Sequence, residues 1–122
     1  ATGEMIISIL ERRLDNVVYR LGLASSRSVA RQLVGHGHLL VNGHRVDIPS
    51  YSVQIGDIVT IRPQSKDLAI FKDRTVNLQK TNPPIWLSLD AEKVEGKVAS
   101  LPKDFEIPFD INLVVDYYSK SK

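Results

Sequence analysis

Seven arginines and no lysine occur in the first 65 residues of this 122-residue chain. They are Arg12, Arg13, Arg20, Arg27, Arg31, Arg45 and Arg62. Arginine carries a planar fork of donors that can hold a phosphate with two hydrogen bonds and can stack on a base. Residues 66–122 carry eight lysines, one arginine and nine acids, so their charges cancel. The pattern favours recognition of an anionic partner by the first half of the chain, with a solvated charged surface as the alternative.

Three histidines, His36, His38 and His44, are the only candidate metal cluster that the sequence offers. Zinc sites need three or four ligands with suitable geometry, and the nearest acid, Asp47, falls in an expected strand. We therefore favour the interpretation that the histidines line a loop that faces an anionic partner. No metal and no cofactor are expected.

Arg13-Leu14-Asp15 resembles the catalytic triplet of pseudouridine synthases, which a strand and loop present inside a much larger domain. Here the triplet falls within an expected helix, where Asp15 is expected to pair with a neighbouring arginine or to orient a backbone group. The chain has no cysteine and no glycine-rich phosphate loop. No Ser, His and Asp set has a distinctive spacing. The sequence therefore predicts no catalytic residue and no enzyme activity.

A helix over residues 10–21 is expected to position the first arginines. Leucine and valine recur along it at intervals of 4, 3, 1 and 3 residues, which traces one helical face, and Gly22 ends it. On this helix Arg13 and Arg20 lie about 20° apart beside the apolar stripe. Their guanidinium groups are therefore expected to act together.

A second, shorter helix is expected to begin at Ser25 or Ser26, whose hydroxyl can cap free backbone amides, and to end at residues 35–37. Its valines and leucine at positions 29, 33 and 34 are expected to face the core. Arg27 and Arg31 are four residues apart, so they project from one face and could bridge successive phosphates.

A β-hairpin follows, with strands at residues 39–41 and 44–48 joined by Asn42-Gly43. Asn-Gly between apolar runs is the strongest short-range hairpin signal, since both central residues of a type I′ turn need positive φ. Pro49 ends the second strand, and residues 58–61 form a third. The first 62 residues therefore predict a small helix-helix-strand-strand-strand unit.

The second half is expected to form a helix capped by Ser65, followed by two short strands. The helix contains Leu68, Phe71 and Leu78 on one side. The strands are expected at residues 85–89, which include Trp86, and at residues 111–118, with a polar loop between them. The longest uncharged apolar run, residues 5–10, is far shorter than the roughly 20 residues that span a bilayer, so no membrane partner is expected.

Several short motifs lie between residues 10 and 62. They are Arg13-Leu14-Asp15, Ser26-Arg27, Ala30-Arg31-Gln32-Leu33-Val34, Gly37, Val41-Asn42-Gly43, Val46 and Gly56-Asp57. Together they resemble the small RNA-binding domain shared by a ribosomal protein, several rRNA pseudouridine synthases and bacterial tyrosyl-tRNA synthetases.

Other segments resemble one family only, the bacterial-type proteins number four (S-four) of the small ribosomal subunit. They are Thr2-Gly3-Glu4, residues 14–22, Ile48-Pro49-Ser50-Tyr51, Trp86-Leu87, Glu95-Gly96-Lys97 and residues 113–120.

The resemblance implies an α+β fold, in which two helices and a small antiparallel sheet form an RNA-binding domain of the αL type. A helix and a tail of short β-strands follow this domain. It implies a lead-in at residues 1–9 from a missing N-terminal region, the RNA-binding domain at residues 10–64, and a C-terminal extension at residues 65–122. The family's RNA contacts fall on nine positions of this chain. They are Arg12, Arg13, Arg20, Arg27, Arg31, His36, His38, Asn42 and Arg45.

The same resemblance implies a structural role in the small ribosomal subunit. The protein is expected to bind the 5′ domain of the small-subunit rRNA directly and to nucleate assembly there. It is also expected to contact ribosomal protein five, to influence decoding accuracy and to lie near the mRNA entrance. The location implied is the cytoplasmic ribosome of a bacterium, or an organellar ribosome. Two alternatives stay open: an RNA-binding appendage of an RNA-modifying enzyme or tRNA synthetase, and a protein-interaction domain with solvated arginines.

Overall fold

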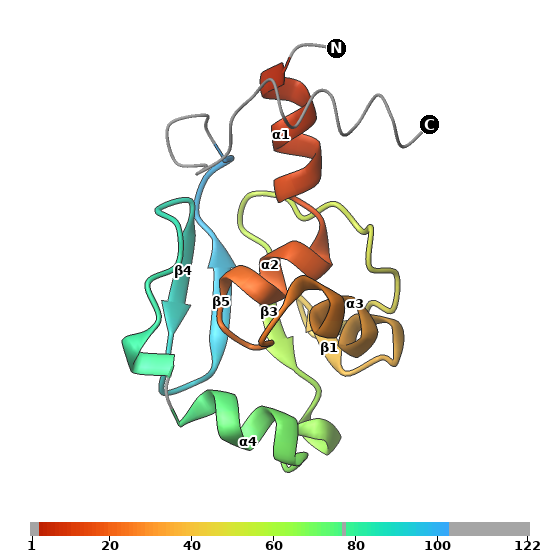
Figure 1. Cartoon of the computed structure of the whole chain (residues 1–122), viewed down its shortest axis with the longest axis vertical. Helices are drawn as coiled ribbons and strands as arrows, with labels where there is room; N and C mark the ends of the chain where they lie inside the picture. Colours follow the sequence, from red (N-terminus) through yellow and green to blue (C-terminus); the bar gives the residue numbers. More distant parts are fainter. Residues whose placement is uncertain (1–2, 77, 103–122) are drawn as a thin grey trace.

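The computed structural model describes residues 3–76 and 78–102, which form helices and one small antiparallel sheet (Figure 1). The helices are α1 (Gly3–Glu11), α2 (Leu14–Arg20), α3 (Arg27–Gly35) and α4 (Ala69–Thr75), with 3₁₀ turns at Pro63–Ser65 and Leu78–Lys80. The strands are β1 (Leu39–Val41), β2 (His44–Arg45), β3 (Ile58–Ile61), β4 (Leu87–Asp90) and β5 (Glu95–Val98). The expected α+β class is confirmed.

All five strands belong to one antiparallel sheet in the order β2-β1-β3-β5-β4. At its centre Val59 of β3 lies opposite Val41 of β1 on one side and Gly96 of β5 on the other. Helices α2 and α3 lie over one face of the sheet, and α4 lies at one end of it (Figure 1). The strands of the second half therefore extend the sheet of the first half.

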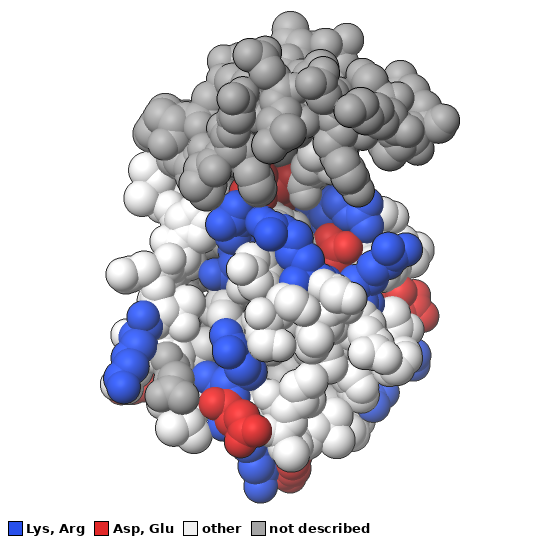
Figure 2. Space-filling model, in the orientation of Figure 1, with Lys and Arg blue, Asp and Glu red and all other residues white. Residues whose placement is uncertain are grey.

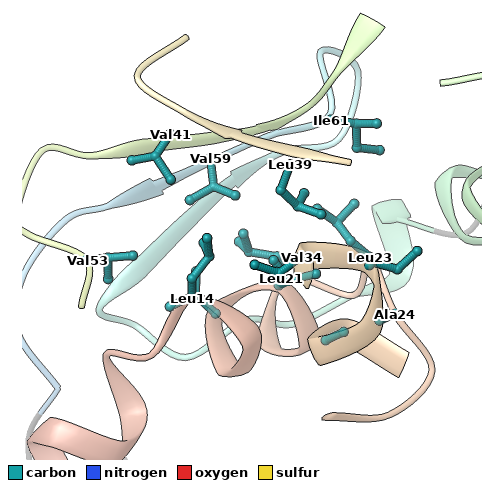
Figure 3. Close-up of a cluster of buried hydrophobic side chains, with 14 of the residues drawn as sticks. Leu14, Leu21, Leu23, Ala24, Val34, Leu39, Val41, Val53, Val59 and Ile61 are labelled. Carbon is teal, nitrogen blue, oxygen red and sulfur yellow. The ribbon is translucent and has the colours of Figure 1, made fainter. Parts of the chain in front are cut away.

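The core lies between this sheet and the helices α2 and α3. Leu14 from α2, Leu21 directly after it and Val34 from α3 point toward the strands, where they meet apolar side chains of β1 and β3 (Figure 3). Strand β5 passes close over α2, because a Cβ atom at Gly96 would overlap the side chain of Leu21. Trp86 and Phe71 complete the core from the second half, and both are fully buried.

The expected single helix over residues 10–21 is wrong, because the chain forms two helices with a break at Arg12-Arg13. The backbone at the break bonds across to a later loop. The carbonyl of Arg12 accepts from the amide of Val53 at 2.9 Å, and the amide of Leu14 donates to the carbonyl of Tyr51 at 2.8 Å. Leu10 therefore belongs to α1, while the apolar face expected from Leu14 onward is buried as predicted.

The second helix and the hairpin are confirmed, with one shorter strand. The Ser26 hydroxyl accepts from the amide of Val29 at 3.1 Å, which caps α3. Asn42 and Gly43 have φ values of 52° and 80°, as a type I′ turn requires. Strand β2 covers only His44–Arg45 instead of residues 44–48.

The second half differs more from expectation. Ser65 does not cap a helix; it lies in a 3₁₀ turn, and α4 begins four residues later. The strand expected at residues 85–89 is Leu87–Asp90, and its partner β5 lies where a polar loop was expected. The tight turn between them has no Asn-Gly signal, since it uses Val94 at a φ of 56°. The strand expected at residues 111–118 lies outside the described residues.

Candidate RNA-binding surface

A buried polar network joins the end of α1 to α2 and α3. The carboxylate of Glu11 is almost fully buried and accepts a hydrogen bond from Nη2 of Arg20 at 2.7 Å. Asn16, also buried, donates from Nδ2 to the Glu11 carbonyl at 2.8 Å and to the Glu11 carboxylate. Its Oδ1 accepts from Nε of Arg27 at 2.9 Å. Two of the predicted RNA-binding arginines are therefore held in place by protein groups.

A second carboxylate holds Arg13 at the start of α2. Nε and Nη2 of Arg13 donate to the two carboxylate oxygens of Asp15 at 3.1 Å and 3.0 Å. The same Asp15 accepts from the backbone amide of Asn16 at 2.7 Å. Both expectations for Asp15 are confirmed. Arg13 thus lies just before α2 in extended conformation, Arg20 is the last residue of α2, and the two pair with different acids, so the expectation that they share one helical face is wrong.

Arg12 holds the loop that bonds to the helix break. Its Nε donates to the carbonyl of Val53 at 3.1 Å, and its Nη2 donates to Oε1 of Gln54 at 2.9 Å. Arg27 on α3 contacts a ring as well as Asn16, since its guanidinium carbon lies 4.7 Å from the centre of the Tyr19 ring. Such a cation over an aromatic face is fixed by electrostatic attraction and by packing.

The outer face of α3 is different. Ser28, Arg31 and Gln32 are exposed, and no hydrogen bond or ion pair of their side chains is found within residues 3–76 and 78–102. They line a groove of about 520 Å³ together with Gly35, His36 and Pro49. We call it the α3 groove.

Cationic groups gather at the turn between α3 and β1. The guanidinium of Arg45 lies directly against Gly37, where a Cβ atom would overlap it. Nδ1 of His38 lies 2.7 Å from the hydroxyl oxygen of Ser65, and its ring meets the edge of Phe71. Partial burial lowers the pKa of His38 below its usual value, and the positive charges of Arg62, His36 and Arg45 lower that pKa further.

Asn42 at the hairpin tip has a structural partner on each side of its amide. Its Nδ2 donates to Oδ1 of Asp57 at 3.0 Å, and its Oδ1 accepts from the amide of Ile58 at 2.9 Å. Asp57 in turn accepts from the amide of Gln54 at 2.8 Å. These bonds fix the hairpin tip to the loop before β3.

Basic and acidic side chains lie close together at the junction of α1 and α2, where Arg13 pairs with Asp15 and Arg20 pairs with Glu11. Figure 2 shows Lys and Arg side chains in a band near the junction of α1 and α2, with acidic side chains between them. Glu11 and Asn16, the buried groups that position Arg20 and Arg27, were not predicted from the sequence. An available signal was Asn16 in the same turn as the apolar residues at positions 14, 17 and 18. Within the described part of the chain, no three His, Asp or Glu side chains gather as metal ligands, and no helix is long and apolar enough to cross a membrane.

Known proteins are similar to this chain in one domain and over nearly the whole chain. Residues 12–59 match the S4 domain. The chain is 50% identical over 123 residues to small ribosomal subunit protein uS4 of Aquifex aeolicus, an alignment that covers 98% of the chain and 58% of that protein. It is 54% identical over 121 residues to uS4A of Alkaliphilus metalliredigens, and 51% identical over 121 residues to uS4 of Halothermothrix orenii, with the same coverage. The chain thus spans less than two thirds of these relatives. Over the length that they share, the chain is similar to uS4 proteins, and residues 12–59 match the S4 domain.

Proposed function

We propose that the chain is a structural constituent of the small ribosomal subunit and binds the subunit's rRNA directly. The observation that carries the proposal is the identity of about half of all positions, across 98% of the chain, with relatives named as small ribosomal subunit proteins. The relatives' names describe ribosomal proteins and no enzyme, so the role proposed is binding without catalysis. The ribosome of a bacterium, or of an organelle, is the location that we propose.

The geometry supports contact through α2, α3 and the β1–β2 hairpin. Structured RNA presents phosphates and 2′-hydroxyls, which a small domain meets best with donors held on rigid elements. Arg20 and Arg27 are held by the Glu11 and Asn16 network, and Arg31 is exposed on α3. A guanidinium has five N–H donors. Pairing of Arg13 with Asp15 therefore leaves donors that can reach a phosphate.

Several finer assignments follow from the family resemblance. We propose that the RNA bound is the 5′ domain of the small-subunit rRNA, and that binding nucleates assembly there. We also propose contact with ribosomal protein five, an influence on decoding accuracy and a position near the mRNA entrance.

An RNA-binding appendage of a modifying enzyme or tRNA synthetase is the second candidate. Similarity to such proteins would rest on the S4 domain at residues 12–59. The similarity to uS4 proteins extends over 98% of the chain, including β4 and β5, which complete the sheet. This extent favours the ribosomal protein.

Binding to purified RNA tests the proposal. We expect the chain to bind a transcript of the small-subunit 5′ domain at least tenfold more tightly than an unrelated RNA of equal length, since specific contacts add to the shared electrostatic attraction. We also expect it to co-sediment with small ribosomal subunits in high salt. Equal affinity for both RNAs would contradict specific rRNA binding.

A further inference from the structure

The α3 groove is large enough for a small ligand and has a rigid far wall. Its volume is about 520 Å³, and the groove is largely open to solvent. Pro49 forms this wall, and the loop around it is tied to the start of α2. The amide of Asp15 donates to the carbonyl of Pro49 at 3.1 Å, and the amide of Leu14 donates to the carbonyl of Tyr51 at 2.8 Å. The groove is therefore expected to keep its shape when the RNA is absent.

Two side chains in the groove, those of Arg31 and Gln32, have donors and acceptors without partners among the described residues. Arg31 carries a charged fork, Gln32 carries one acceptor and two donors, and neither makes a hydrogen bond within the described ranges. The His36 ring is exposed beside them. This set differs from Arg12, Arg13 and Arg20, which are bonded to protein oxygens.

Gly35 is the most informative residue of the groove. It is the last residue of α3, and glycine is a weaker helix former than alanine, by up to roughly 1 kcal/mol in a helix interior. Gly22 and Gly96 are explained by close neighbours, and Gly43 by its positive φ, but a Cβ atom at Gly35 would meet nothing within 4 Å. The fold therefore does not require glycine here, whereas a ligand that enters the groove does require the space that the missing side chain leaves.

We propose that the α3 groove holds one unpaired nucleotide of the bound RNA. Arg31 binds its phosphate, the amide of Gln32 bonds the edge of its base, and the base lies against the His36 ring and Pro49. Proteins read RNA mainly at unpaired bases, which stack on rings and expose their hydrogen-bonding edges. This inference rests on the proposed rRNA binding, which it refines by separating a base-reading groove from the phosphate-binding arginines.

The decisive variant is Gly35→Leu, which fills the groove and removes no charge. We expect its affinity for the 5′-domain transcript to fall about tenfold, since one stacked base contributes on this scale. The matched control is Gly35→Ala, whose single methyl group should change affinity less than threefold while raising helix stability. Both chains are checked by circular dichroism and thermal melting. Wild-type affinity of a folded Gly35→Leu chain would overturn the proposal.

Salt dependence separates loss of a base contact from loss of a phosphate contact. For Gly35→Leu the slope of log affinity against log salt should stay at the wild-type value, whereas for Arg31→Gln it should fall by roughly 0.7. A slope that falls equally in both variants would overturn the assignment of a base to the groove. If Gly35→Leu does not fold, His36→Ala decides, with an expected loss of about fivefold that no change would overturn.

Titration with small probes tests the site without the large RNA. Uridine 5′-monophosphate should shift the amide resonances of residues 28–36 and of Ser50, while inorganic phosphate should shift mainly those near Arg31. Identical shifts with both probes would overturn the base contact. A wild-type chain that does not prefer the 5′-domain transcript refutes the proposed function, whereas wild-type binding that Gly35→Leu and His36→Ala leave unchanged refutes the groove alone.

Discussion

Arg20 at the end of α2 donates to the buried carboxylate of Glu11 at 2.7 Å, and its side chain is 17% exposed. Arg31 on α3 is exposed and bonds no group within the described part of the chain. The family resemblance implied that both arginines contact RNA. The difference comes from their surroundings, because α1 supplies an acid to α2, whereas among residues 3–76 and 78–102 no acid pairs with the outer face of α3. The junction of α1 and α2 holds its arginine in place, whereas the outer face of α3 leaves its polar groups available to a ligand.

The largest loss of stability is expected from removal of Glu11, the buried acid that holds Arg20. Changing Glu11 to Ala removes the buried carboxylate that accepts from Nη2 of Arg20 and from Nδ2 of Asn16, and removing one partner of such a pair costs about 3 kcal/mol. Urea denaturation should show this loss in the free energy of unfolding. The control is Glu92→Ala, at an exposed acid in the turn between β4 and β5, which should change stability by less than about 0.5 kcal/mol. Equal stability of the two variants would show that the network does not support the fold.

The two arginines of α3 are expected to differ from each other. Arg27→Ala leaves the buried Oδ1 of Asn16 without this donor and removes the cation from the Tyr19 ring, so we expect a loss of about 2 kcal/mol in stability as well as weaker RNA binding. Arg31→Ala should weaken RNA binding with stability changed by less than about 0.5 kcal/mol. Changing both to Glu should remove most of the affinity for the 5′-domain transcript.

Urea denaturation and RNA titration of the same samples check this difference. If Arg31→Ala unfolded as easily as Arg27→Ala, the contrast between a bonded and an available arginine would be wrong. If the folded double Glu variant bound as tightly as the wild type, α3 would not be part of the RNA-binding surface.

The sequence predicted local features well wherever a short signal decided them. Ser26 caps α3, Asn42-Gly43 turns the hairpin, and Asp15 pairs with Arg13, all within a few residues along the chain. It failed where long-range contacts decided. The break at Arg12-Arg13 depends on a loop about 40 residues away, and Ser65 bonds His38, 27 residues earlier, instead of capping a helix.

In the candidate site, too, the sequence predicted what short-range signals decide and missed what long-range contacts decide. Residue types and spacing predicted which arginines lie on α3, but the partners that hold Arg20 and Arg27 come from other elements. Strand β5 was missed because Glu95-Gly96-Lys97 has low β-propensity. It forms because β3 and β4 supply hydrogen bonds on both sides and because Leu21 needs the space above Gly96.

A smaller loss of stability is expected at the hairpin between β1 and β2, which carries Arg45. Gly43 has a φ of 80°, and a Cβ atom there would meet nothing within 4 Å, so a substitution is opposed by backbone conformation alone. Gly43→Val should destabilise the chain by about 1 kcal/mol, because a β-branched residue resists positive φ. Thermal melting measures this, and Gly35→Ala is the control, since Gly35 lies in a helix with open space beside it. An unchanged melting temperature for Gly43→Val would contradict the type I′ turn.

The smallest effect is expected from His38, whose charged neighbours in the described part of the chain are the cations Arg62, His36 and Arg45. Burial lowers its pKa, and Arg62, His36 and Arg45 lower it further, so the folded chain takes up the proton less readily than the unfolded chain does. The free energy of unfolding is therefore highest above the unfolded pKa of 6.5, where His38 is neutral in both states. It decreases as pH falls below 6.5, because the unfolded chain then takes up the proton more readily. Urea denaturation at about pH 7.5 and about pH 5.5 should show the loss for the wild type and a smaller one for His38→Gln. The same loss in both chains would show that other groups cause the pH dependence.

Nearby RNA phosphates favour the protonated ring, so we also expect RNA binding to strengthen modestly over this fall in pH, with chelators having no effect.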